Sequence, residues 1–415
     1  MDGRNDQALN MESPLTFLCI ASYFKGNRFM QALKQCGARV FLLTSKKHED
    51  KAWPRESLDE IFYMESDERN HWIMEDAVKG LAFLMRREKI DRIVALDDFD
   101  VEKAALLREE FRIPGMGQTT ARYFRDKLAM RLRAQATGVA VPAFTPIFND
   151  EMVNGFIRDT PGPWMLKPRG EASATGIKKI ETAEQVWKQI QELGEERHQY
   201  LLERFLKGQV YHMDSIVQDG MVLFCRCSQY LAPPFEVAHG GGIFRSVTLE
   251  PEDEDNRALL RLNEDILGGF NLRSSAAHTE ALKSEEDGKF YFIETSARVG
   301  GAHLAEMVEF ATGINLWEEW AKVEYTAALY QPHLLKSWDP GHAGILISLA
   351  RHKSQDYSRI SDPEIVWTMT DMDHHFGCIV KSHDRRRIIE LLDQYTALVQ
   401  AEFHATAPAP DKPIH

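Results

Sequence analysis

This chain of 415 residues lacks several features that would directly indicate its class, such as a membrane span or a disulfide framework. It contains no run of 18 apolar residues, which excludes a helical membrane span. Residues 1–13 lack the apolar core of a signal peptide, and we expect them and the proline-rich residues 405–415 to be disordered tails. There are only five cysteines, an odd number without framework spacing, which indicates reduced thiols and a cytoplasmic location.

Positive charge is also scarce. Lys and Arg number 50 against 63 Asp and Glu, and the net charge of -13 argues against a nucleic-acid binder, because phosphate backbones need a basic face. A local basic pocket for a nucleotide stays compatible with this balance. The apolar share of 44% is typical of a globular protein, and the length predicts two to four domains.

The N-terminal part lacks a G-x-G-x-x-G motif but has the pattern of a parallel sheet. Apolar runs at Leu15–Ile20, Arg39–Leu43 and Arg92–Leu96 predict strands, and helical spacing separates them. We therefore expect a Rossmann-like domain over residues 14–117, without a dinucleotide.

Three acids, Asp97, Asp98 and Asp100, follow the third of these apolar runs. In parallel sheets ligands bind at the carboxyl ends of strands, so a ligand role is one interpretation. Capping of the next helix is the other, and the sequence leaves both open.

The middle of the chain predicts mixed structure. Thr119–Thr137 has the pattern of one basic amphipathic helix, and Thr182 to Gln185 marks the start of another helix. Asp219-Gly220 predicts a hairpin turn between two strands. A strand near Ala343–Leu349 and a helix near Asp384–Ala401 then predict a C-terminal α/β segment.

The most informative stretch begins with the apolar run Phe290–Ile293, which predicts a buried strand. It delivers a carboxylate, a hydroxyl, a guanidinium and two glycines at Glu294, Ser296, Arg298, Gly300 and Gly301. Glu280 lies 14 positions upstream of Glu294. Two acids on neighbouring strands can share hard divalent cations, and an arginine nearby can neutralise phosphate or an oxyanion. This layout predicts a phosphoryl-transfer site.

A second motif combines Lys167 with a loop of small residues. Backbone amides in such a loop can close over phosphate oxygens, although no Walker A lysine follows. The alternative is a mobile surface hairpin. The loop comprises Gly170, Glu171, Ala172, Ser173, Ala174, Thr175 and Gly176.

Two further features are weak in isolation. The run Glu203, Phe205 and Leu206 predicts a strand leading into a connector, whose backbone can pair with an adenine edge while the acid meets the exocyclic amine; a solvated edge strand is the alternative. Asp126-Lys127, in a predicted helix, is by itself a surface pair.

The stretch from Pro233 to Arg245 contains three glycines, which permit close backbone approach to a ligand. Glu236, His239 and Arg245 could select an amine, act as a base and hold a carboxylate, or the stretch is a long glycine hairpin with incidental charges. His278, beside the metal acid, is a further substrate candidate. A polar cluster, Asp371, Asp373, His374 and His375, is interpreted as a solvated loop.

The order of these motifs along the chain resembles the ATP-grasp superfamily, specifically carboxylate–amine ligases close to biotin carboxylase, carbamoyl phosphate synthetase and the L-amino acid ligases. The resemblance covers about Leu15–Glu324. It implies an α/β fold, α+β in its central part: a Rossmann-like domain, an ATP-grasp domain at 118–325 with a lid at about 145–203, and a small C-terminal α/β subdomain at 326–404.

The resemblance also implies residue roles. ATP phosphates would contact Lys127, Lys167 and the flap Gly170–Gly176, and adenine would contact Glu203, Phe205 and Leu206. Two magnesium (or manganese) ions would bind Glu280, Glu294 and Ser296, and an acyl phosphate would be steadied by Arg298, Gly300 and Gly301.

Two positions depart from the family pattern. Ser296 stands where an asparagine is usual, and Val210 stands where an acid usually binds the ribose. Gln209, His212 or Asp214 would take the ribose role instead.

The resemblance predicts an ATP-dependent ligase that joins a carboxylate to an amine, most simply two amino acids, through an acyl phosphate. Small molecules are then its partners, without nucleic acid or membrane, and the family implies a homodimer formed through the first domain. A bicarbonate-activating carboxylase and a decayed ATP-binding regulatory protein are the alternatives.

Overall fold

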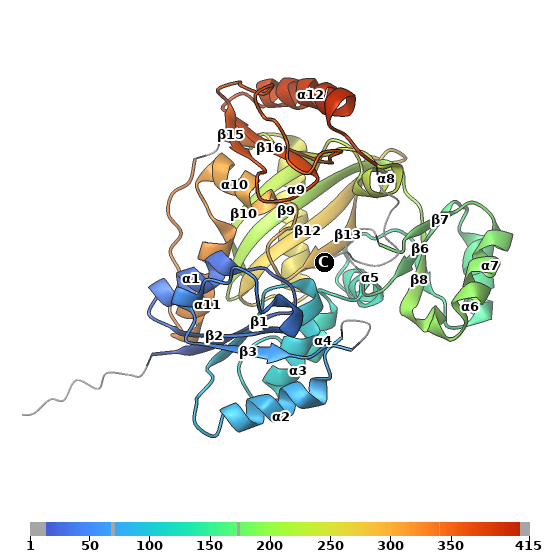
Figure 1. Ribbon diagram of the computed structural model, residues 1–415. Helices are drawn as coiled ribbons and strands as arrows, with labels where there is room; N and C mark the ends of the chain where they lie inside the picture. The colour runs from blue at the N-terminus through green and yellow to red at the C-terminus, as the bar shows by residue number, and fades with distance from the viewer. Residues whose placement is uncertain (1–13, 68–70, 172–174, 340, 407–415) are drawn as a thin grey trace, which may run out of the picture.

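The computed structural model describes residues 14–67, 71–171, 175–339 and 341–406. It contains one parallel sheet, a small antiparallel sheet and a large antiparallel sheet. Figure 1 shows the parallel sheet below the large sheet, and the small sheet projecting from the side of both. This mixed architecture confirms the predicted α/β fold class.

The N-terminal sheet is parallel, with the order β3-β2-β1-β4. Buried apolar side chains on both of its faces explain the continuous apolar runs of β1 and β2, because helices cover each side. The edge strand β3 was not predicted; it is only half-buried and lacks such a run. The elements are β1 (Thr16–Ala21), α1 (Asn27–Gln35), β2 (Arg39–Ser45), β3 (Glu60–Met64), α2 (Met74–Leu84), β4 (Arg92–Ala95) and α3 (Val101–Phe111).

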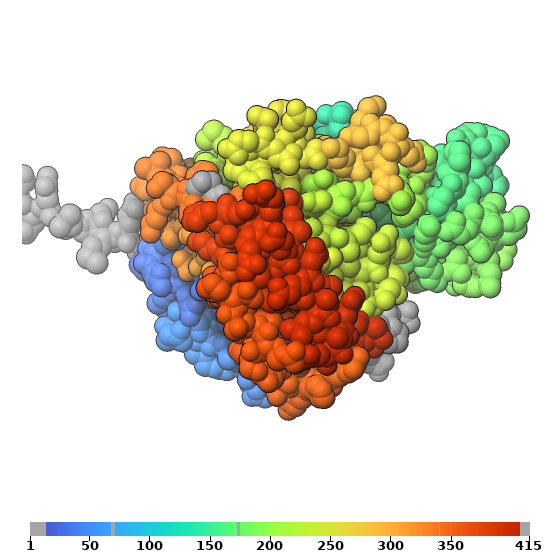
Figure 2. Space-filling model, turned by 90° about the horizontal axis from the view of Figure 1, so that it is seen from above, coloured from blue at the N-terminus to red at the C-terminus, as the bar shows by residue number. Residues whose placement is uncertain are grey.

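The small sheet has the order β5-β8-β6-β7 and its own apolar core against two helices. In Figure 2 it forms a green lobe that projects from the body of the molecule. The capping box predicted at Thr182 and Gln185 begins α7. The range proposed for a lid, 145–203, falls on this lobe, and its movement stays a prediction. The elements are β5 (Phe144–Pro146), α6 (Asp150–Asp159), β6 (Trp164–Pro168), β7 (Lys178–Ile180), α7 (Ala183–Leu193) and β8 (Tyr200–Arg204).

The large sheet has the order β13-β12-β9-β10-β11-β14-β16-β15. Its central hairpin turns at Asp219-Gly220, as predicted, and both turn residues have positive φ (51° and 83°). The strands are β9 (Gly208–Gln218), β10 (Met221–Tyr230), β11 (Phe244–Thr248), β12 (Ser275–Ser284), β13 (Phe290–Ser296), β14 (His342–Leu349), β15 (Ile365–Thr368) and β16 (His375–Ser382).

The C-terminal segment, where an α/β subdomain is expected at 326–404, contributes strands to the large sheet. Its strands β14, β16 and β15 extend the large sheet through pairing of β11 with β14. The helix α12 (Arg385–Glu402) covers this end of the sheet with buried apolar residues. Helix α5 (Lys127–Ala136) also packs against the large sheet, as do α9 (Glu254–Gly269), α10 (Leu304–Thr312) and α11 (Leu316–Ala328).

Two local predictions were wrong. The single helix predicted over Thr119–Thr137 is two helices, α4 (Gln118–Arg122) and α5 (Lys127–Ala136), because the Asp126 side chain accepts hydrogen bonds from Leu128 N and Ala129 N and caps a new helix. The glycine stretch is not a hairpin: its first half is the short helix α8 (Pro234–Gly240). Within the described residues, no helix is long and apolar enough to cross a membrane.

Candidate active site

One cavity of about 800 Å³ brings together most of the predicted site residues. Its walls come from the small sheet, the near end of the large sheet and α8, so residues distant in sequence share one space. The predicted residues in its lining are Lys127, Lys167, Glu203, Phe205, Leu206, Glu236, His278, Glu280, Glu294, Arg298 and Gly301.

The two predicted metal acids lie directly opposite one another. Glu280 on β12 pairs with Glu294 on β13 in the antiparallel register, so both side chains leave the same face of the sheet. Tyr230 donates its hydroxyl to Oε1 of Glu280 at 2.7 Å. Lys127 Nζ lies 3.0 Å from Oε2 of Glu294. Each carboxylate thereby has a hydrogen-bonding or charged partner at the cavity wall.

The donor set fits a hard divalent cation, which prefers oxygen ligands. Burial works against ionisation of Glu280, but the neighbouring imidazole of His278 and the Tyr230 hydroxyl outweigh it and hold the pKa of Glu280 below its usual value. Glu280 therefore lines the cavity as a carboxylate. Ser296, the third predicted ligand, lies opposite His278 in the register, two pairs along from the two acids, and is not in the lining.

Lys127 is not the surface residue that its local sequence indicates. The residue is 6% exposed, because α5 begins at Lys127 and this residue lines the cavity. Nζ donates to the carbonyl of Glu171 at 2.6 Å, and the backbone N donates to the carbonyl of Arg169 at 2.8 Å. The break in the predicted helix thus gives Lys127 its position beside the small-residue loop.

The small-residue loop connects β6 to β7. Thr175 is buried, and Gly176 has a φ of 68°, which favours glycine at this position. Gly170 leaves open space toward Arg125, whose Nη2 lies 4.0 Å from where a Cβ would stand. Ser173 and Ala174 lie outside the described residues, so their predicted phosphate contacts stay predictions.

Glu203 occupies a different place from the one expected. Its carboxylate is 1% exposed and accepts hydrogen bonds from Lys167 Nζ at 2.5 Å and from Arg131 Nε at 2.6 Å. Both oxygens are engaged, so the expected contact from this carboxylate to an exocyclic amine is not available here. Arg131, which is fully buried and 72 positions from Glu203, had no local signal in the sequence.

This triad has an electrostatic consequence for Lys167. Burial lowers the pKa of its ammonium group, and the charge of Glu203 opposes that shift. The same burial acts against ionisation of Glu203, but Arg131 and Lys167 keep the pKa of Glu203 below its usual value. Lys167 therefore reaches the cavity as one member of a buried charge network.

The far end of the cavity is apolar. Leu206, Val210, Tyr230 and Leu282 form a buried cluster there. The ammonium of Lys179 lies 4.6 Å from the centre of the Phe205 ring. Apolar side chains beside a strand connector suit a nucleobase.

His212 does not line this cavity, in contrast to the expected ribose contact. It is fully buried on strand β9, and its ring contacts Asp214 and Ser246. Asp214 is equally buried, so of the three alternatives for the ribose only Gln209 is in the cavity wall.

Arg298 meets the acids that follow β4. Its Nε donates to Oδ2 of Asp98 at 3.0 Å, and Nη2 contacts the same oxygen. Asp98 is 6% exposed and its second oxygen has no hydrogen-bond partner. Burial raises the pKa of this carboxyl, but the Arg298 charge outweighs it and lowers the pKa of Asp98 to about 2.

Of the two interpretations of the three acids, the structure shows capping for Asp97, and the ligand role stays a prediction. Asp97 caps the following turn by accepting from Phe99 N at 3.1 Å. Asp98 instead reaches the site residue Arg298, 200 positions away in the sequence.

Of the three substrate-binding candidates in the glycine stretch, one lines the cavity and two lie outside it. Glu236 lines the cavity from α8. His239 lies outside the lining, and its ring packs on Phe235 at 4.2 Å between centroids. Arg245 points away toward α12, where Nη1 contacts Oδ1 of Asp393 at 2.6 Å.

The acidic and histidine residues at 371–375 remain a mostly exposed loop, with Lys353 Nζ 3.5 Å from Asp373. Among the residues that the structure describes, the one group of three or more His, Cys, Asp or Glu side chains spaced to hold a metal ion is His212, Asp214 and His278.

Comparison with known proteins finds sequence relatives among ligases. The chain is 26% identical over 234 residues to an L-arginine-specific L-amino acid ligase from Bacillus subtilis, a match that covers 55% of this chain and 56% of that protein. It is 24% identical over 246 residues to a D-alanine--D-alanine ligase from Cupriavidus necator, covering 56% of this chain and 73% of that protein. The chain thus spans about half the length of the first of these relatives. No protein-family model matches it.

Solved structures show the same fold over nearly the whole chain. An L-amino acid ligase from Bacillus licheniformis superposes with a TM-score of 0.71 at 16% identity, covering 94% of this chain and 98% of that one. A biotin carboxylase from Campylobacter jejuni superposes with a TM-score of 0.67 at 15% identity, covering 94% and 92%.

Proposed function

We propose that this chain, which belongs to the ATP-grasp superfamily, is an ATP-dependent ligase that joins a carboxylate to an amine. The observation that carries the proposal is the placement of two opposed carboxylates and three cations in one cavity. Glu280 and Glu294 face each other across β12 and β13, and Lys127, Lys167 and Arg298 line the same space. Phosphoryl transfer needs this combination, because it depends on positioning and charge neutralisation.

The reaction that fits is a two-step condensation. The carboxylate oxygen of the first substrate takes the γ-phosphoryl group of ATP, and ADP leaves. The amine nitrogen of the second substrate then attacks the carbonyl carbon of the acyl phosphate, the bond from that carbon to the phosphate oxygen breaks, and the nitrogen loses a proton. Phosphate and an amide are the products.

Residues of this chain have distinct tasks in that scheme. Glu280 and Glu294 would hold magnesium, which supplies charge neutralisation to the phosphates. Lys127 and Lys167 would bind phosphate oxygens, and Arg298 with the Gly300–Gly301 amides would bind the developing oxyanion. Glu236, the cavity acid on α8, would bind a cationic group of a substrate. Lys127, Lys167 and Arg298 each pair with a carboxylate. When ATP binds, phosphate oxygens would take the place of these carboxylates as partners of the cations.

Amino acids are the substrates that we propose, because two of the relatives are amino acid ligases by name. The test is phosphate release from MgATP with each of the twenty amino acids, singly and in pairs, followed by mass spectrometry. Arginine is included because one relative is specific for it. We expect release that depends on a pair, with a product equal to the two amino acids minus water. Release with bicarbonate alone would instead establish a carboxylase, and ATP binding without any release would indicate a regulatory protein.

A further inference from the structure

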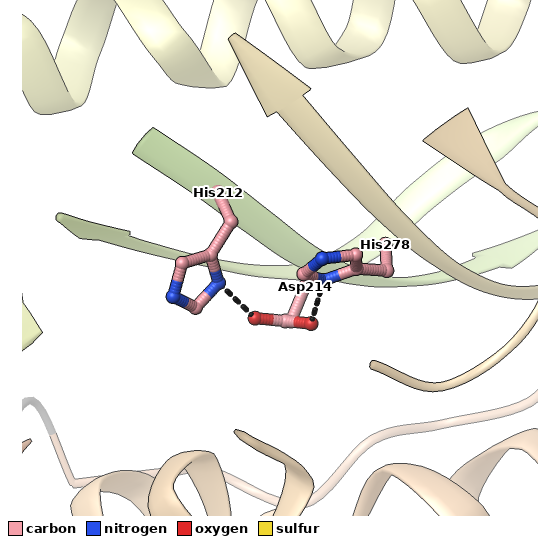
Figure 3. A group of neighbouring side chains, drawn as sticks. All are labelled: His212, Asp214 and His278. Atoms are coloured by element: carbon pink, nitrogen blue, oxygen red, sulfur yellow. Dashed lines mark hydrogen bonds and ion pairs between the residues drawn. The ribbon is translucent and has the colours of Figure 1, made fainter. Parts of the chain in front are cut away.

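The sheet face that bears the two metal acids continues onto the next strand as a square of four ionisable side chains. In the register of β12 with β9, Glu280 lies opposite His212 and His278 lies opposite Asp214. Residues directly opposite in neighbouring strands, and residues two apart in one strand, point to the same face. Figure 3 shows three of these four side chains, His212, Asp214 and His278, with Asp214 between the two imidazole rings.

Each oxygen of Asp214 binds a different ring. Nδ1 of His212 lies 2.7 Å from one oxygen, and Nδ1 of His278 lies 2.8 Å from the other. The outer nitrogen of His212 contacts the Ser246 hydroxyl at 2.7 Å. The outer nitrogen of His278 lies 3.6 Å from Oε1 of Glu280. The result is a continuous polar chain from Ser246 to the metal acid.

The contacts of the two imidazole rings differ from those expected at a metal site. A metal ligand must turn a ring lone pair toward the ion, which is incompatible with donating from the same nitrogen to a carboxylate. Here both Nδ1 atoms are at hydrogen-bond distance from separate oxygens of one carboxylate. The arrangement is that of a carboxylate orienting two imidazoles.

The same carboxylate also supports the turn that carries the predicted oxyanion donors. A Cβ on Gly300 would lie 2.9 Å from Oδ1 of Asp214 and 2.9 Å from Nδ1 of His278. The backbone at Gly300 therefore packs directly on this hydrogen-bonded pair, and only glycine leaves the necessary space. His278 itself lines the cavity, whereas Asp214 is fully buried behind it.

We propose that Asp214 is a positioning residue that orients His278 between the metal acid Glu280 and the Gly300–Gly301 turn. Its carboxylate places two parts of the site, the metal ligand and the oxyanion donors, relative to each other through one imidazole ring. His212 and Ser246 hold Asp214 from the other side. The assignment of Glu280 to magnesium rests on the proposed function, whereas the contacts of Asp214 are properties of the structure.

The test measures metal binding directly, without turnover. Mn²⁺ binding in the presence of a non-hydrolysable ATP analogue is titrated by electron paramagnetic resonance for the wild type, Asp214→Asn and His278→Gln. Asparagine has the shape of aspartate, but its amide offers a donor to one of the two N–H groups, so the His278 ring loses its orientation. We expect Mn²⁺ binding to weaken by about 10- to 100-fold in Asp214→Asn, as for other residues that orient metal ligands.

The matched control is His342→Gln. His342 is another buried histidine on the large sheet, with an acid 3.0 Å away at Glu250, but it does not line the cavity. We expect its Mn²⁺ binding to stay within about twofold of the wild type, which separates an effect on metal from general loosening of the sheet. His278→Gln acts at the cavity wall, and it gives the answer if Asp214→Asn does not fold; we expect it to weaken Mn²⁺ binding by at least about tenfold.

Several outcomes would overturn the inference. Wild-type Mn²⁺ affinity in a folded Asp214→Asn or in His278→Gln would show that the chain of contacts does not position the metal acid. Stoichiometric zinc in the purified protein, lost in Asp214→Asn, would show that the cluster is a metal site. A wild-type protein that binds neither Mn²⁺ nor the nucleotide would overturn the proposed function as well. This result differs from the first outcome, in which the wild type binds Mn²⁺ and the variants bind it equally well.

Discussion

The two ends of the large sheet are built in opposite ways. At the β14–β16 end, the strands bury apolar residues such as Ile345, Leu346 and Val380 under α12 and α10. At the β13–β12–β9 end, the sheet face beside the cavity carries acids and imidazoles instead. Burying charged groups costs free energy unless each has a partner, so the second end contributes less to stability than the first. The comparison separates the part of the sheet that contributes most to stability from the part that we propose binds ligands.

The largest expected effect is at the polar end. Glu294→Gln removes a charge that would hold metal, and we expect kcat to fall on the order of a thousandfold, while the melting temperature changes little. The measurement is phosphate release under saturating MgATP. Glu286→Gln is the control, because Glu286 is an exposed acid in the turn between β12 and β13 whose carboxylate pairs with Arg204, away from the cavity acids. Equal turnover in Glu294→Gln and the wild type would exclude the metal assignment.

The apolar end should respond in the opposite sense. Leu392 on α12 is fully buried and packs close to Gly344 of β14. Leu392→Ala leaves a cavity, and we expect the free energy of unfolding to fall by about 2–5 kcal/mol, with normal activity per folded molecule. Urea unfolding and phosphate release on the same sample measure the two quantities. A large loss of turnover in the folded variant would contradict the separation of the two ends.

The Asp98–Arg298 pair connects the polar end to the N-terminal sheet. The pKa of Asp98 is about 2, below its unfolded value, so its contribution to stability is present above about pH 4 and is lost as the pH falls through 2. We expect Asp98→Asn to remove on the order of 2 kcal/mol of stability at neutral pH and to flatten the acid limb of the stability profile.

The same variant should also affect turnover, because Arg298 loses the carboxylate that holds it. We expect a decrease of up to about a hundredfold in kcat/KM. Asp97→Asn is the matched comparison, since Asp97 follows the same strand but contacts Lys25 and Phe99 instead of Arg298. If the two variants lose the same amount of activity, the specific role of the Asp98–Arg298 contact is contradicted.

The smallest effect is expected at Ser296. Ser296→Asn introduces the residue usual in the family, with a longer side chain that brings an oxygen closer to the acids. We expect the Mg²⁺ concentration for half-maximal activity to fall about threefold, because one oxygen ligand of several changes. A rise instead would show that the pocket around Ser296 is adapted to serine.

Local patterns predicted much of this molecule. The Asp219-Gly220 turn, the capping box of α7 and the apolar strand before Glu294 are all signals within a few residues, and each element lies where its signal indicated. The helix break at Asp126 was not predicted, because an amphipathic pattern continues across it. Only the capping hydrogen bonds from Leu128 N and Ala129 N to the Asp126 side chain reveal that a new helix starts there.

The sequence by itself determined the fold class, the strand that carries Glu294 and the set of side chains suited to a nucleotide and metal, because these depend on spacing and on residue chemistry. Only the tertiary structure decided which charges meet. Arg131 with Glu203, Arg298 with Asp98, and His278 with Asp214 join residues 72, 200 and 64 positions apart. No local pattern encodes such pairs, because they form where separate elements pack and where burial makes each charge depend on its partner.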